Sequence, residues 1–197
     1  MKILVLFGHP AFQKSQVNRR LLTGIEAIPN VTFHDLYEAY PEMDIDIDVE
    51  QALLREHDCI VFQHPFYWYS APAIFKEWQD LVLEHGWAYG SKGKNLVGKY
   101  FFSAITVGAP RSSYAVGASQ GSTINQFLLP FFRMAELCQM TALPPFVVHG
   151  TLMVTDAHCS VVSHDYHKFL RSLAVDEVDF KTLAQYDYIN DYLKTEI

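Results

Sequence analysis

The chain has 197 residues, of which 50% are hydrophobic and 19% are charged, a composition typical of one well-packed globular domain. Its net charge of −7 argues against nucleic acid or an anionic membrane as the main partner, because the average surface repels both. The three cysteines are widely spaced, and no apolar run approaches the roughly 20 residues of a membrane span. We therefore expect a cytoplasmic protein whose thiols are reduced.

The first strand, turn and helix organise the rest of the chain. Ile3–Phe7 is a continuous apolar run followed by Gly8, which predicts a central strand buried on both faces. Ser15 is a good N-cap for a helix whose apolar face contains Val17 and Leu21. Because unpaired N–H groups and the positive end of the helix dipole point to the same place, this arrangement predicts a site for a phosphate group.

Three phosphate-binding patterns compete at this turn. The dinucleotide fingerprint Gly-x-Gly-x-x-Gly is absent, since the turn contains only Gly8. Gly8 followed by Gln13-Lys14-Ser15 matches the P-loop at every fixed position except the second glycine, which that loop needs to fold round its phosphates. A flavodoxin-like turn, in which polar side chains and helix-end amides hold one phosphate, fits best, and an empty turn before a capped helix is the plain alternative.

Strands and helices alternate along the remainder of the chain. The patterns predict strands at residues 31–37, 59–62, 100–107 and 144–149, and helices at 49–57, 73–85, 123–139 with a break near Pro130, and lastly 158–173. This alternation predicts an α/β fold with a doubly wound, five-stranded parallel sheet in the order 2-1-3-4-5. Residues 1–175 would form this domain. Residues 176–197, with six acidic and two basic side chains, would form an acidic extension that docks on the domain or on a partner subunit.

In this topology, ligands bind beyond the carboxyl ends of the strands. The residues expected there are polar after the first strand, aromatic after the third, and small after the fourth: His9, Ser15 and Asn18; Phe66 to Tyr69; Thr106, Gly108, Ala109 and Tyr114. They suit a flat cofactor with a phosphate tail, since aromatic rings can cover the apolar end of an isoalloxazine and backbone amides can bind its polar edge. A cluster that only covers the core is the alternative for the aromatic loop.

Four His and Cys residues near the last predicted helix, namely His158, Cys159, His164 and His167, raise the question of a metal. Their spacing fits no common zinc pattern. We therefore predict that His164 and His167, which are three residues apart, lie on an exposed helix face, and that there is no metal site.

The chain contains the motifs Gly8-His9-Pro10, Ser15-x-x-Asn18, Gln63-His64-Pro65-Phe66-Tyr67-Trp68-Tyr69-Ser70, Lys76-Glu77-Trp78, His85-Gly86-Trp87-Ala88-Tyr89-Gly90 and Pro144-Pro145-Phe146. Together these motifs resemble those of the flavodoxin-like NAD(P)H:quinone oxidoreductases. Within that family they are similar to the small bacterial ancillary proteins of the glutathione-gated potassium efflux systems. The likeness covers residues 1 to about 173 and implies a flavodoxin-like fold that binds FMN, with FAD as the alternative.

The resemblance also implies roles for particular residues. By it, His9, Ser15, Gln16, Val17 and Asn18 bind the phosphate and ribityl region, Phe66, Tyr67, Trp68 and Tyr69 line the isoalloxazine, and Thr106, Val107, Gly108 and Ala109 hold its pyrimidine side. Tyr114 and Gln120 occupy the positions of a catalytic Tyr and His. Two departures from the family pattern matter. The family often has Thr-Thr-Gly-Gly where this chain has Thr106-Val107-Gly108-Ala109, so Val107 and Ala109 differ. Gln120 stands where the family has His, and a glutamine side chain cannot take up a proton.

The implied activity is ping-pong hydride transfer from NAD(P)H through flavin N5 to a quinone, with protons from water or Tyr114. Family members are homodimers, and Phe131-Phe132 would belong to that interface. The alternative function is that of a regulatory subunit that binds and activates a glutathione-gated potassium efflux transporter, which would place the chain at the inner membrane through a protein partner. The departures at Ala109 and Gln120 slightly favour this alternative.

Overall fold

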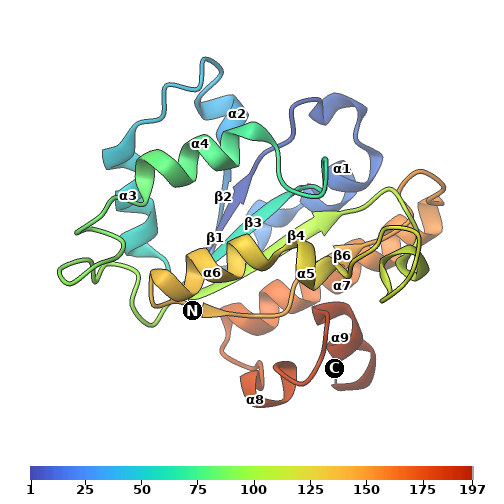
Figure 1. Cartoon of the computed structure of the whole chain (residues 1–197). Coiled ribbons are helices and arrows are strands. Elements are labelled where there is room, and N and C mark those ends of the chain that lie inside the picture. Colours follow the sequence, from blue (N-terminus) through green and yellow to red (C-terminus); the bar gives the residue numbers. More distant parts are fainter. Residues whose placement is uncertain (197) are drawn as a thin grey trace.

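The computed structural model describes residues 1–196, and its centre is one parallel sheet (Figure 1). The strands are β1 (Ile3–Phe7), β2 (Val31–Asp35), β3 (Cys59–Pro65), β4 (Tyr100–Thr106), β5 (Thr141–Ala142) and β6 (Phe146–Val148). They are ordered β2-β1-β3-β4-β5, with β6 also paired to β4, and every pairing is parallel. The predicted fold class and strand order are confirmed.

Helices cover both faces of the sheet (Figure 1). They are α1 (Gln16–Leu22), α2 (Leu36–Ala39), α3 (Ile47–Glu56), α4 (Ala73–Val82), α5 (Ile124–Phe127), α6 (Leu129–Leu137), α7 (Asp156–Ala174), α8 (Phe180–Leu183) and α9 (Ile189–Glu196). Side chains of β1 alternate between two cores, as the period of a strand requires. Leu4 and Leu6 pack with α3, α4 and α6, whereas Ile3 and Val5 pack with α1 and α7.

Several element boundaries differ from the predicted ones for local reasons. The second strand ends at Asp35, because its carboxylate accepts hydrogen bonds from the N–H groups of Tyr37 and Glu38 and so caps α2. The outermost strand is divided into β5 and β6 by the segment with Pro144 and Pro145, which have no N–H to donate to a ladder. The predicted break near Pro130 is present, since α5 ends at Phe127 and α6 begins at Leu129.

Helix α7 is not the last helix, because the acidic segment folds into α8 and α9 (Figure 1). Leu183 and Ile189 of this segment are fully buried in the core beneath α7. The N–H of Ile189 donates to the carbonyl of Pro145 at 3.0 Å. Asn190 Oδ1 accepts from the N–H of Val147 at 2.8 Å. The segment therefore docks along β6, at one edge of the sheet.

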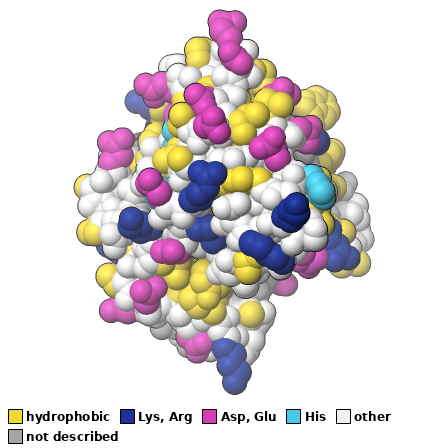
Figure 2. All heavy atoms as spheres, turned by 90° about the vertical axis from the view of Figure 1, so that its left-hand side faces the viewer, with side chains coloured by type: hydrophobic (Ala, Val, Ile, Leu, Met, Phe, Trp, Pro, Cys, Tyr) yellow, Lys and Arg dark blue, Asp and Glu magenta, His cyan; other side chains and the backbone are white. Residues whose placement is uncertain are grey.

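The surface carries charges of both signs. On the face shown in Figure 2, acidic and basic side chains are interspersed with apolar ones. Among the described residues, no helix combines the length and the apolar character needed to cross a bilayer.

Candidate functional site

A cavity of about 560 Å³ lies at the carboxyl ends of β1, β3 and β4, where the topology predicts ligand binding. Its lining comes from four loops: His9, Ala11, Lys14, Ser15, Gln16 and Val17; Pro65, Phe66 and Tyr67; Thr106 and Gly108; Thr151 and Leu152. The structure thus brings together the predicted phosphate turn, two of the four aromatic residues and part of the loop after β4. The cavity joins a polar end to an aromatic end.

The polar end is organised by Asn18, which is buried behind the cavity. Its Nδ2 donates to Ser15 Oγ at 3.1 Å and to Thr106 Oγ1 at 3.0 Å, so it ties the start of α1 to the end of β4. Ser15 Oγ also accepts from the N–H of Asn18 at 3.3 Å, as an N-cap does. Asn18 Oδ1 is buried without a partner among the described residues. Both hydroxyls can donate as well as accept, so the Asn18 amide can hold Ser15 and Thr106 with either of its ends.

His9 supplies an uncharged N–H donor to this end of the cavity. Its Nδ1 accepts from the N–H of Ala11 at 3.1 Å, which leaves the proton on Nε2. Burial lowers the pKa of His9, so the ring is neutral at pH 7. Lys14 adds an ammonium group to the same lining. A neutral donor, a cation and the first N–H groups of a helix together suit a phosphate.

The aromatic loop after β3 turns sharply and separates its four rings. Tyr67 and Ser70 bridge each other, and the two residues between them, Trp68 and Tyr69, have φ angles of 50° and 63°. Tyr67 lines the cavity, but Trp68 is 94% exposed and Tyr69 stacks on Phe127 at a ring distance of 4.9 Å. The predicted wall of four aromatic residues therefore does not form around this cavity within the chain, because the turn directs Trp68 and Tyr69 elsewhere.

The loop after β4 is also only partly in the cavity. Thr106 and Gly108 line it, whereas Val107 is fully buried and its N–H donates to the carbonyl of Val148 at 2.8 Å. The carbonyl of Ala109 accepts from the N–H of Gly150 at 3.0 Å. The side chain of Val107 thus belongs to the core, and Ala109 is tied by its backbone to the loop after β6.

Tyr114 and Gln120 lie beside the aromatic loop, outside the cavity lining. The ring of Tyr114 lies 6.1 Å from that of Phe66, and burial raises its pKa, so it is protonated at pH 7. Its hydroxyl has no hydrogen-bond partner among residues 1–196. Gln120 Oε1 accepts from the hydroxyl of Tyr69 at 3.1 Å. The two predicted catalytic residues thus flank the same loop, and Gln120 is engaged by Tyr69.

The lining includes residues that the sequence did not single out as site residues: Ala11, Lys14, Pro65, Thr151 and Leu152. Thr151 and Leu152 follow β6, and the N–H of Thr151 donates to the carbonyl of Val107 at 3.1 Å. Leu152 is 85% exposed and lies over Gly108, where a Cβ would come within 3.4 Å of it. The rule that places ligands at strand ends could have found both, because the predicted fifth strand ends at His149.

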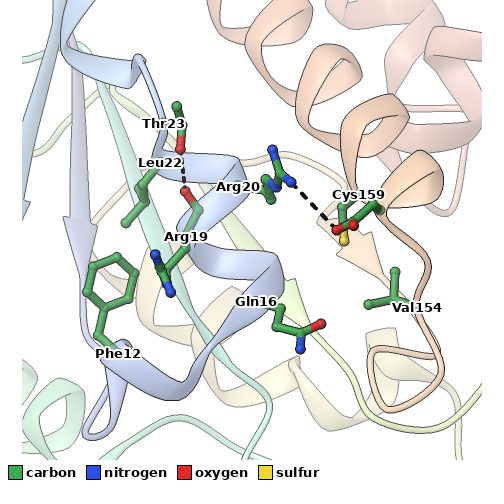
Figure 3. Close-up of a pocket in the computed structure, with 9 residues that line it drawn as sticks. Phe12, Gln16, Arg19, Arg20, Leu22, Thr23, Val154 and Cys159 are labelled. Carbon is green, nitrogen blue, oxygen red and sulfur yellow. Dashed lines mark hydrogen bonds and ion pairs between the residues drawn. The ribbon is translucent and has the colours of Figure 1, made fainter.

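A second cavity, of about 720 Å³, lies between α1 and the start of α7 (Figure 3). Its lining is Phe12, Gln16, Arg19, Arg20, Leu22, Thr23, Val154, Asp156 and Cys159. Gln16 lines both cavities, so they adjoin at the first turn of α1. Arg20 forms an ion pair with Asp156 at 3.5 Å. Within residues 1–196, no group of three or more His, Cys, Asp or Glu side chains could hold a metal ion.

A protein-family model described as "Flavodoxin-like fold" matches residues 1–170. The chain belongs to this flavodoxin-like family. Among curated proteins, it is 50% identical over 148 residues to the glutathione-regulated potassium-efflux system ancillary protein KefG of Salmonella paratyphi B. The match covers 75% of this chain and 81% of that protein. The predicted resemblance is confirmed.

Solved structures agree with this flavodoxin-like assignment. A chain described as a thermophilic tryptophan halogenase from Streptomycin violaceusniger is 40% identical, with a TM-score of 0.83, and the match covers 85% of this chain and 97% of that one. The general stress protein 14 of Treponema denticola, in complex with FMN, is 34% identical with a TM-score of 0.82, covering 88% and 99%. An NADPH-quinone reductase from P. pentosaceus is 30% identical with a TM-score of 0.78, covering 86% and 97%.

Proposed function

We propose that this flavodoxin-like protein is an FMN-dependent NAD(P)H:quinone oxidoreductase. One observation carries the proposal: a single cavity joins the polar turn around Ser15 and Asn18 to the aromatic rings of Phe66 and Tyr67. That combination fits a ligand with a phosphate at one end and a flat ring at the other. An FMN complex and an NADPH-quinone reductase among the structural neighbours support the same conclusion.

The chain's own residues fit FMN group by group. His9 Nε2, Lys14 and the first N–H groups of α1 would bind the phosphate, and Asn18 would hold Ser15 and Thr106 in place at the cavity wall, where their hydroxyls would meet the ribityl chain. Phe66 and Tyr67 would cover one side of the ring system. Gly108 leaves room for close approach of the backbone at the ring's polar edge.

Bound FMN would supply hydride acceptance and delivery at its N5 atom. The protein's part is to bind, to orient and to hold protons. Tyr114 keeps its proton at pH 7 and has a free hydroxyl, so it would donate a hydrogen bond or a proton to a reduced group beside Phe66. Gln120 would act only by holding Tyr69. With one open side for both substrates, NAD(P)H would leave before the quinone enters, which is a ping-pong course.

FAD is the alternative cofactor, because the second cavity adjoins the first at Gln16 (Figure 3). Arg19 and Arg20 give that cavity positive charge, and Phe12 gives it an aromatic wall, so it could take the nucleotide half of FAD. We propose FMN first because a neighbour 34% identical to this chain binds FMN. Releasing the flavin by heat and separating it by chromatography would distinguish the two.

A second proposed function is that of an ancillary subunit that binds and activates a potassium efflux transporter, since KefG is an ancillary protein of such a system. This would bring a protein of the cytoplasm to the inner membrane. We also propose a homodimer. An apolar groove of about 510 Å³ between α4 and α6, lined by Phe131 and the half-exposed Leu137, is a surface that a second copy could cover.

The decisive experiment is the visible spectrum of the FMN-reconstituted protein under anaerobic conditions, recorded before and after NADPH or NADH and again after a quinone. Bleaching by a nicotinamide and recovery with quinone are expected. Asn18→Ala should weaken FMN binding by at least about tenfold, since it removes the hydrogen bonds that join α1 to β4. Asn95→Ala is the matched control, because Asn95 donates a hydrogen bond to the carbonyl of Trp87, away from the cavity. A bound flavin that neither nicotinamide bleaches would refute the enzyme proposal, and co-purification with the transporter would then test the second.

A further inference from the structure

Helix α9 contacts the loop that carries Tyr114. Arg111 begins the short 3-10 helix that ends at Tyr114, and its two terminal nitrogens donate to the carboxylate of Asp191 at 2.7 and 2.6 Å. This is a bidentate pair, which fixes direction as well as distance. The Arg111 side chain is half exposed and that of Asp191 one-quarter exposed, so solvent screens the pair only in part.

A series of ring contacts also connects the start of α9 to Tyr114. The Arg111 guanidinium lies 4.5 Å from the ring centre of Tyr188, which is buried. Tyr188 lies 5.7 Å from the ring of His149, and His149 lies 5.8 Å from the ring of Tyr114. Both ring nitrogens of His149 are buried without a partner among the described residues, so packing alone fixes this ring. The chain of contacts runs unbroken from α9 to the Tyr114 ring.

Within itself, the loop from Gly108 to Gly121 is held by local backbone hydrogen bonds, such as the one from the N–H of Gln120 to the carbonyl of Ser113 at 3.1 Å. Its regular part is a four-residue 3-10 helix from Arg111 to Tyr114, and Gly117 and Gly121 have positive φ angles. Such short elements are marginal without tertiary contacts. The acidic segment supplies a further contact just beyond the loop, since Asn125 Nδ2 donates to the carbonyl of Asp187 at 3.2 Å.

We propose that residues 176–196 are part of the scaffold of the active site, with α9 positioning Tyr114 through Arg111, Tyr188 and His149. The proposal rests on the proposed function in so far as Tyr114 serves quinone reduction. Asp191, Arg111 and Tyr188 are positioning residues, because they act only through Tyr114. The match to the family model ends at residue 170, so the segment that would position Tyr114 lies outside the part of the chain that the family shares.

The test compares Asp191→Ala with Glu136→Ala in the full chain. Glu136 pairs with Arg133 on α6, so the control removes a carboxylate from another arginine ion pair, one that lies on the other face of the sheet and has no link to Tyr114. The first readout uses 3-fluorotyrosine at position 114 and records its ¹⁹F resonance without flavin. Asp191→Ala should shift the resonance and lower the phenol pKa toward its ordinary value, since a loosened loop exposes the ring to water. Glu136→Ala should leave both unchanged.

The second readout is a double-mutant cycle on quinone reduction. Asp191→Ala should lower kcat about fivefold, the rate equivalent of about 1 kcal/mol, and have no further effect in a Tyr114→Phe background. A general loss of stability would instead lower activity equally in both backgrounds. An unchanged ¹⁹F resonance, or an additive cycle, would overturn the positioning role. If the wild type reduces no quinone, the proposed function fails, and the ¹⁹F comparison still decides whether α9 positions Tyr114.

Discussion

The buried carboxylate of Glu50 on α3 allows a sharp prediction of stability. Glu50 is 0% exposed and accepts three hydrogen bonds of 2.7 Å, from Tyr40 Oη and His34 Nε2 on one oxygen and from Trp78 Nε1 on the other. These bonds join β2, the connection that follows α2, and α4. Since α4 begins just after the aromatic loop, the cluster also supports one side of the candidate site.

Glu50→Met keeps the length of the side chain but removes every acceptor. The N–H of Trp78 is then stranded in the core, at a cost of about 1–3 kcal/mol, and two charge-assisted bonds are lost at about 1.5–3 kcal/mol each. Part of this loss is offset, because Glu50→Met no longer buries a charge and adds apolar contact in the core. We therefore expect the free energy of unfolding to fall by about 3 kcal/mol. For a chain of this size, Tm should fall by roughly 6–12 °C.

Glu50→Gln separates the hydrogen bonds from the charge. Its amide oxygen can accept from Trp78 while its NH₂ group donates to Tyr40 and His34, so the loss should be only about 1 kcal/mol. Urea unfolding at pH 7 measures both variants. Equal losses for Glu50→Gln and Glu50→Met, or a loss below about 1 kcal/mol for Glu50→Met, would refute the view that acceptor geometry stabilises this cluster.

The pH dependence of the same variants has a definite sign. Burial disfavours the Glu50 carboxylate, but hydrogen bonds from His34, Tyr40 and Trp78 outweigh it and lower the pKa of Glu50 below 4.5, its ordinary value. A lowered pKa in the folded state means that the stabilisation is fully present above pH 4.5 and is lost as the pH falls through the folded value. The difference between wild type and Glu50→Met should therefore stay constant from pH 7 to 5 and shrink below it.

Two further substitutions test the backbone around the cavity. In Gly8→Ala, the new Cβ would lie 2.7 Å from Phe75 Cε2, so overpacking should cost about 1–3 kcal/mol in urea unfolding, and an unchanged midpoint would show that Phe75 moves freely. In Trp68→Gly, relief of the positive φ should raise stability by up to about 1 kcal/mol, and the FMN dissociation constant should stay within about twofold because Trp68 does not line the cavity. A large loss of FMN affinity would show that the ring of Trp68 folds over the bound flavin.

The sequence was sufficient for the sheet because its signals are local. Apolar runs such as Ile3–Phe7 and Cys59–Phe62 are strands buried on both faces, and alternation with helices leaves few topologies. The N-cap at Ser15 followed from the same local signals, and β4 ends at Thr106, one residue before the predicted end at Val107.

Three features could not be predicted from the sequence, because they depend on contacts or backbone conformations that no local sequence pattern indicates. Glu50 belongs to a helix with a water-facing side, yet its partners come from distant segments of the chain. The apolar residues of the acidic segment are scattered among charged and polar ones, so its sequence does not indicate a packed element. The role of Asp191 depends on Arg111, which lies 80 residues away in the chain. Trp68 and Tyr69 adopt positive φ angles. Glycine or asparagine at these positions would have predicted such a turn, whereas bulky aromatic residues do not indicate it.

The strained turn at Trp68 and Tyr69 is informative because it has a cost. A left-handed conformation costs a residue with a Cβ about 1–2 kcal/mol, and an Asn-Gly pair would avoid most of it. Tyr69 offsets its share by stacking on Phe127 and donating to Gln120. Trp68, at 94% exposure, gains almost nothing from this chain. Contacts within the chain therefore leave the strain at Trp68 without an offset, and the stability of Trp68→Gly measures how large that strain is.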